Sequence, residues 1–108
     1  MITFKPGVKV GRARPVVSTI ILVVGSCYAK LGYDCVVTSI DDGQHKTDSL
    51  HYLGQAVDFR LNDLSGIPIV HRVELVKLVQ SAFGVEFDVL HEFRGTPDEH
   101  LHVEHDPK

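Results

Sequence analysis

A chain of 108 residues is long enough for one modest hydrophobic core and too short for two, so we expect a single domain spanning residues 1–108. Eleven basic and fourteen acidic residues give a net charge of −3 without a basic stripe, which excludes the electrostatic footprint of a nucleic-acid-binding protein. The seven histidines are the unusual feature of the composition, because histidine is the commonest metal ligand in proteins.

The N-terminal region combines an extended arm, Met1–Gly11, with a strongly apolar helix. The helix is predicted over Pro15–Leu31, because a proline opens it and a glycine follows it. Its apolar run ends just before Cys27 and so imitates a lipoprotein signal, yet it is too short to span a bilayer and its helical spacing continues past the cysteine. Together with Cys35, which lacks the spacing of a disulfide framework, this predicts no membrane span and synthesis in a cytoplasm without a cleaved signal.

The rest of the chain is predicted to alternate strands, turns and one further helix. The expected elements are a strand over Asp34–Ser39, a loop over Ile40–Asp48, a strand over Gln55–Arg60, a helix over Ile67–Phe83, a strand over Val85–Glu92 and a last strand from about His100. Short turns between strands favour antiparallel pairing. We therefore expect an α+β fold with a small antiparallel sheet and helices packed on one face.

A histidine and an aspartate seven positions apart form the first candidate site. Ser49 can cap a short helical turn that contains His51, and Gly54 can supply the left-handed exit from that turn. In the strand that follows, Asp58 lies on the face opposite to the aliphatic residues. The turn and the strand can therefore direct His51 and Asp58 at one point.

A second candidate site lies in the last strand, where His100 and His102 share one face. Zinc catalysis requires three protein ligands and one open position, and His51, Asp58 and His102 supply a suitable set. Glu99 is the candidate catalytic base, which takes a proton from the metal-bound water. This role requires the strand to begin at about His100, so that Glu99 stays on the loop before it.

The pattern S-x-H-x-x-G-x-A-x-D in 49–58, followed by E-x-x-H in 99–102, resembles a family of zinc peptidases. They are the D-alanyl-D-alanine carboxypeptidases and L-alanyl-D-glutamate endopeptidases, which include vancomycin-resistance dipeptidases and phage endolysins. The resemblance implies a Hedgehog-like fold, zinc held by His51, Asp58 and His102, and Glu99 as the base. It also implies a substrate, the stem peptide of bacterial peptidoglycan, and hence action on the cell wall. The bond that is cut and a cellular or phage origin both stay open.

One departure from that family concerns substrate binding. The family usually carries an arginine in a G-Y-R segment before the histidine motif, and the corresponding segment here, Thr38–Gly43, has none. His45 and Lys46, on the same loop, are candidates to replace it. Further candidates for contacts with the substrate are Ser49, Arg60 and His100.

Two other functions are compatible with the sequence. The missing arginine allows a zinc-binding module of the same fold that has lost turnover. Two histidines and a carboxylate are also the ligand set of non-haem iron oxygenases. In those enzymes the first histidine and the carboxylate are almost adjacent, whereas His51 and Asp58 are seven positions apart. A solvated sheet face accounts for the H-x-H pattern alone, but not for the combination of both motifs.

Overall fold

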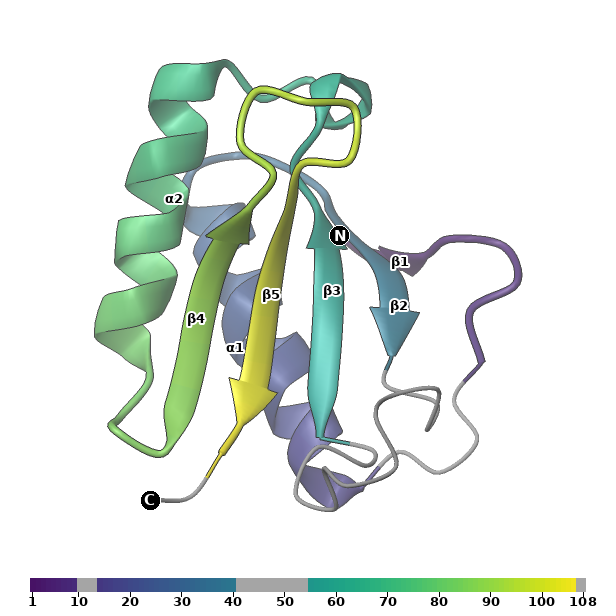
Figure 1. Cartoon of the computed structure of the whole chain (residues 1–108), viewed down its shortest axis with the longest axis vertical. Helices are drawn as coiled ribbons and strands as arrows, with labels where there is room; N and C mark the ends of the chain where they lie inside the picture. The colour runs from purple at the N-terminus through teal and green to yellow at the C-terminus, as the bar shows by residue number, and fades with distance from the viewer. Residues whose placement is uncertain (10–13, 41–54, 107–108) are drawn as a thin grey trace.

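The protein folds around a five-stranded sheet with the strand order β1-β2-β3-β5-β4 (Figure 1). The computed structural model describes residues 1–9, 14–40 and 55–106. The strands are β1 (Ile2–Phe4), β2 (Cys35–Ile40), β3 (Ala56–Arg60), β4 (Phe87–Glu92) and β5 (His100–His105). The helices are α1 (Pro15–Lys30) and α2 (Ile69–Ala82), with a short 3-10 helix, η2 (Asp63–Ser65). The α+β class expected from the sequence is confirmed.

The sheet is mixed rather than antiparallel throughout. β2–β3, β3–β5 and β5–β4 pair antiparallel, whereas β1 pairs parallel with β2, with Ile2 opposite Cys35. The prediction of an antiparallel sheet is therefore wrong for β1, which forms within the segment predicted as an extended arm. A parallel pair needs a long crossover, and α1 provides it between β1 and β2. Gly25 allows this crossover to pack closely, because a Cβ there would collide with the side chain of Ile2.

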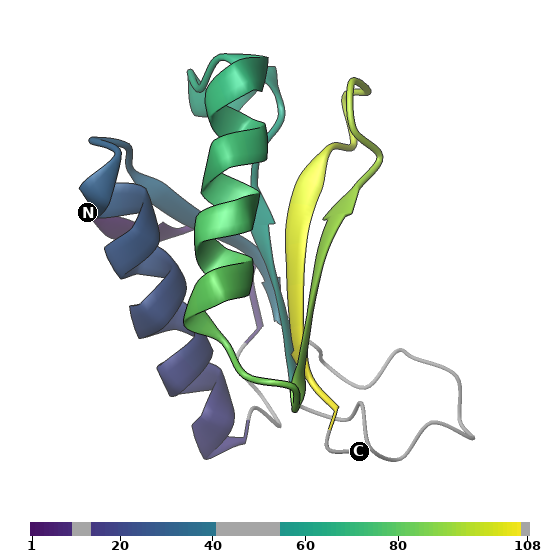
Figure 2. The ribbon, with the colours of Figure 1, turned by 90° about the vertical axis from the view of Figure 1, so that its left-hand side faces the viewer.

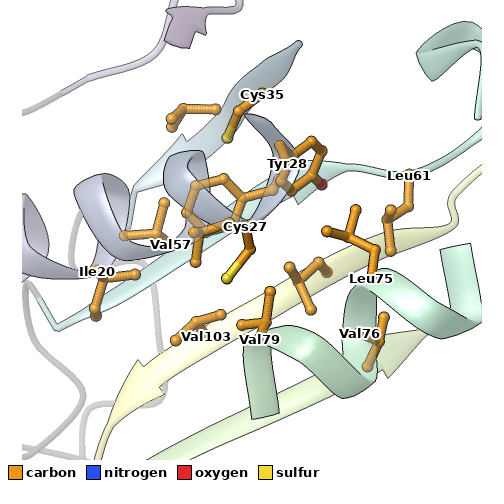
Figure 3. Packing of buried hydrophobic residues seen from close by; sticks show 14 of the residues in the cluster. Ile20, Cys27, Tyr28, Cys35, Val57, Leu61, Leu75, Val76, Val79 and Val103 are labelled. Atoms are coloured by element: carbon orange, nitrogen blue, oxygen red, sulfur yellow. The ribbon is translucent and has the colours of Figure 1, made fainter. Parts of the chain in front are cut away.

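Both helices cover the same face of the sheet, as Figure 2 shows. Val57 and Phe59 of β3, together with Leu101 and Val103 of β5, face the helices and are almost fully buried. Figure 3 shows side chains of α1, α2 and the sheet meeting in this core. Because side chains alternate along a strand, the intervening polar residues point to the opposite face. No helix of the described residues covers that face.

The two helices begin and end close to the predicted positions. α1 begins at Pro15 and is followed by Gly32 at a φ of 82°, which is the left-handed exit that glycine permits. α2 begins two residues later than predicted, because Pro68 occupies its N-cap position. In the described part of the chain, neither helix has the length and hydropathy needed to cross a membrane. The predicted turn around Ser49 lies outside the described residues.

Candidate metal centre on the open face of the sheet

Polar side chains form cross-strand rows on the face of the sheet that the helices leave open. In one row, Arg60 of β3 lies opposite His100 of β5, which lies opposite Glu92 of β4. In the next row, Asp58 lies opposite His102. Residues opposite each other on neighbouring strands project to the same face, so the register alone brings these side chains together.

The distances show a compact cluster of nitrogen and oxygen donors. Nδ1 of His102 is 2.7 Å from Oδ1 of Asp58, and Nε2 of His100 is 3.8 Å from the same oxygen. Nε2 of His100 is also 2.8 Å from Oε1 of Glu92, which lies 4.0 Å from Nδ1 of His102. Donor atoms of Asp58, Glu92 and His100 all lie within 4.8 Å of one another and could hold a metal ion.

His102 is held between two carboxylates. Its second ring nitrogen, Nε2, lies 2.7 Å from Oε1 of Glu104, while the other oxygen of Glu104 is buried and has no hydrogen-bond partner among the described residues. Burial lowers the pKa of His102, but the hydrogen bonds and charges of Asp58 and Glu104 outweigh burial and raise this pKa to about 9. In the metal-free protein His102 is therefore protonated at neutral pH, and both ring nitrogens donate.

We expect the metal-free protein to lose stability as the pH rises from about 6.5 to about 9. The pKa of His102 is higher in the folded state than its ordinary value of 6.5, so the folded state binds this proton more tightly. The resulting stabilisation is complete below pH 6.5 and is lost as the pH passes through 9. Thermal unfolding in chelator across this range measures the loss, and His102→Gln serves as the control in which this part of the curve is flat. A parent protein that keeps its full stability up to pH 9 would contradict the raised pKa of His102.

Glu99 occupies a different environment from the cluster. β5 begins at His100, as predicted, but the carboxylate of Glu99 is directed at the helix layer. Oε1 of Glu99 accepts from Nη1 of Arg72 in α2 at 2.6 Å, and Oε2 lies 2.6 Å from Nε2 of His91 in β4. The residue is 2% exposed. Both oxygens of the candidate base are therefore engaged away from Asp58.

Arg72 connects three elements at this point. Besides Glu99, its guanidinium donates to the carbonyl oxygen of Ile67 at 2.6 Å and to Oδ1 of Asp63 in η2 at 3.1 Å. This network fixes the start of α2 against the start of β5. The sequence pattern predicted an amphipathic helix here and gave Arg72 no role.

The sequence-predicted residues divide into three groups. Asp58, His100 and His102 meet in the cluster, and Arg60 lies in the same row as His100. Glu99 is turned toward α2. Outside the described part of the chain lie the remaining predicted site residues, which are His45, Lys46, Ser49 and His51.

Glu92 is the member of the cluster that the sequence analysis missed. Its signal is the alternation along β4, in which Phe87, Val89 and His91 share one face and Glu92 lies on the other. That alternation becomes informative only with the β4–β5 register, which sets Glu92 opposite His100.

Comparison with known proteins assigns no family, since no family model matches the chain and no curated protein matches it.

Proposed function

We propose that the protein is a zinc peptidase with a Hedgehog-like fold that hydrolyses a peptide bond in the stem peptide of bacterial peptidoglycan. The observation that carries the proposal is the contact between Asp58 and His102 on the open face of the sheet. Nδ1 of His102 lies 2.7 Å from Oδ1 of Asp58. These two residues come from the two motifs that the sequence resemblance rests on, 49–58 and 99–102. The third ligand in the proposal is His51, from the first motif.

The donor set of the cluster fits zinc. Imidazole nitrogen and carboxylate oxygen are the ligands of catalytic zinc sites with an open position. A histidine that binds a metal usually donates its other ring N–H to a carboxylate, and Glu104 accepts such a bond from Nε2 of His102. Nδ1 of His102, which faces Asp58, is then the nitrogen left for the ion. His51, Asp58 and His102 would hold it, and bound zinc supplies a polarised substrate carbonyl and a water of lowered pKa.

The side chains around these ligands have separate tasks in the proposal. Glu104 fixes the ring of His102, and Glu92 fixes the ring of His100 through the 2.8 Å contact at Nε2. Glu99 is the base that the E-x-x-H motif implies. To take a proton it must release at least one of its two bonds, to Arg72 or to His91. The more exposed Glu92 is the competing carboxylate, because it already lies beside both histidines.

The engaged state of Glu99 favours a second candidate function. A protein that binds zinc through the same residues and does not turn over substrate would have no need of a free carboxylate at this position. The same module would explain the segment before the histidine motif, which lacks the arginine usual in the family. Zinc binding is common to both functions, so only product formation separates them.

We expect the purified protein to bind one zinc ion and to release new ends from the stem peptides of purified peptidoglycan. Metal analysis and mass spectrometry of the digest measure the two properties, and the masses of the products identify the bond. His51→Ala and His102→Ala should lose zinc. His71→Ala is the matched control, because His71 is exposed in α2 and bonds to Tyr33 instead. Zinc without any product would favour the non-catalytic module, and iron-dependent oxygen consumption would favour an oxygenase.

A further inference from the structure

A half-open pocket of about 360 Å³ adjoins the candidate metal centre at the end of β3. Its lining includes Lys5, Thr38, Arg60, Asn62 and His100. His100 belongs both to this pocket and to the metal-binding cluster. The pocket is therefore a neighbouring subsite of the same open face.

The fold positions the two basic residues of this pocket through the backbone. The N–H of Lys5, the residue after β1, donates to the carbonyl oxygen of Val37 in β2 at 2.8 Å. Arg60 is the last residue of β3, and its carbonyl oxygen accepts from the hydroxyl of buried Tyr28 at 2.9 Å. The side chain of Asn62 donates to the carbonyl oxygen of Pro97 at 3.0 Å, which closes the corner beyond β3.

Two positively charged side chains of the pocket, those of Arg60 and Lys5, are available to a ligand. Within the described ranges, no hydrogen bond or ion pair engages the side chain of Arg60 or of Lys5. Among the described lining residues, two carboxylates are also present, but Arg72 neutralises Glu99, which leaves Asp98 to oppose the two cations. The balance favours an anionic group. A guanidinium is suited to one, because its planar fork matches the geometry of a carboxylate.

We propose that this pocket binds a carboxylate group of a peptide substrate, with Arg60 as the principal contact and Lys5 as the second. The inference rests on the proposed peptidase function and adds a substrate class to it. Arg60 and Asp58 project to the same face two positions apart, a spacing of about 7 Å along a strand. That distance corresponds to about two residues of extended peptide. The carboxylate is therefore close to the bond that is cut.

Two kinds of carboxylate satisfy this distance, and the experiment separates them. One is the free C-terminus of a peptide, and the other is a glutamate within it. Three stem peptides serve as probes: the unmodified peptide, the same peptide with an amidated C-terminus, and the same peptide with glutamine in place of glutamate. Binding is followed by NMR in the metal-free protein, where the side-chain N–H of Arg60 reports direct contact. Because this readout needs neither zinc nor turnover, it is independent of the proposed activity.

We expect Arg60→Gln to weaken binding of the unmodified peptide by about 10- to 100-fold, as for the loss of a charge-assisted hydrogen bond. Arg60→Lys should restore only part of the affinity, since an ammonium lacks the fork. Arg94→Gln is the matched control, because Arg94 is exposed outside the pocket, and it should leave affinity unchanged within about twofold. One modified peptide should bind the parent as weakly as the unmodified peptide binds Arg60→Gln.

Three results would overturn the inference: equal effects of Arg60→Gln and Arg94→Gln, equal binding of all three peptides, or no binding to the parent at millimolar concentration. Loss of zinc-dependent hydrolysis with these binding differences intact would instead count against the proposed function alone. Arg60→Gln retains the backbone carbonyl that Tyr28 uses, so the fold should survive. Should it not, Lys5→Gln provides the second variant, with an expected loss of about two- to tenfold for an exposed cation.

Discussion

Replacing Arg72 with methionine is expected to destabilise the protein by about 3–5 kcal/mol. Arg72 is 8% exposed and Glu99 is 2% exposed, so the substitution leaves a buried carboxylate without its cation. It also removes the bond to the carbonyl oxygen of Ile67, which anchors the start of α2. A buried pair that loses one partner costs much more than an exposed pair, because water cannot replace the missing charge.

Urea unfolding of a double-mutant cycle measures this coupling. Arg72→Met and Glu99→Met should each be costly, whereas the double variant should be less destabilised than the sum of the two. Asp63→Asn is the internal control, because Asp63 contacts the same guanidinium with a fully exposed side chain and should cost less than about 1 kcal/mol. An Arg72→Met protein as stable as Asp63→Asn would show that the pair contributes nothing.

Two roles of Glu99, as a catalytic base and as a partner in the buried network with Arg72 and His91, can be separated by substitution. If Glu99 is the base, the Glu99→Gln protein should keep its fold and its zinc, and its turnover should fall on the order of 10²–10⁴-fold. If Glu99 is instead a structural partner of Arg72 and His91, the same substitution should lower the free energy of unfolding whether or not substrate is present. Glu92→Gln completes the comparison, because Glu92 lies at the cluster and outside the buried network. Turnover that depends on Glu92 and not on Glu99 would transfer the role of base to β4.

The elements that could be predicted from the sequence are those with local signals. Pro15 and Gly32 bracket α1, and the alternation from Ala56 to Arg60 identifies β3 with Asp58 on its polar face. The same alternation in β5 pairs His100 with His102 on one face. Once β3 and β5 are neighbours in antiparallel register, Asp58 and His102 must meet, and the structure brings them to 2.7 Å.

The features that escaped prediction depend on partners distant in the sequence. β1 is three residues long, and its parallel pairing follows from the crossover through α1 rather than from its own residues. The direction of Glu99 is set by Arg72, which lies 27 positions away and donates to the buried carboxylate at 2.6 Å. The E-x-x-H spacing places Glu99 before the strand. It determines neither the partner of the Glu99 carboxylate nor the face of the sheet that this carboxylate reaches.

Removal of residues 1–26 is expected to abolish folding. The truncation, which begins the chain at Cys27, deletes Val17, Ile20 and Val24, all of which are buried in the core. It also removes β1, which pairs with β2. Burial of each of these three side chains contributes about 1.5–3 kcal/mol, so their joint loss rivals the roughly 5–15 kcal/mol that keeps a typical domain folded.

Far-UV circular dichroism and amide NMR dispersion of the truncated chain test this expectation, and single substitutions on the same helix grade it. Ile20→Ala should cost about 2–5 kcal/mol, because the side chain is fully buried and its removal leaves a cavity. Leu22→Ala, two positions away and 65% exposed, should change the free energy of unfolding by no more than about 0.5 kcal/mol. Cooperative unfolding of the truncated chain would contradict the place of α1 in the core, because it would show that the sheet folds without the buried side chains that α1 contributes.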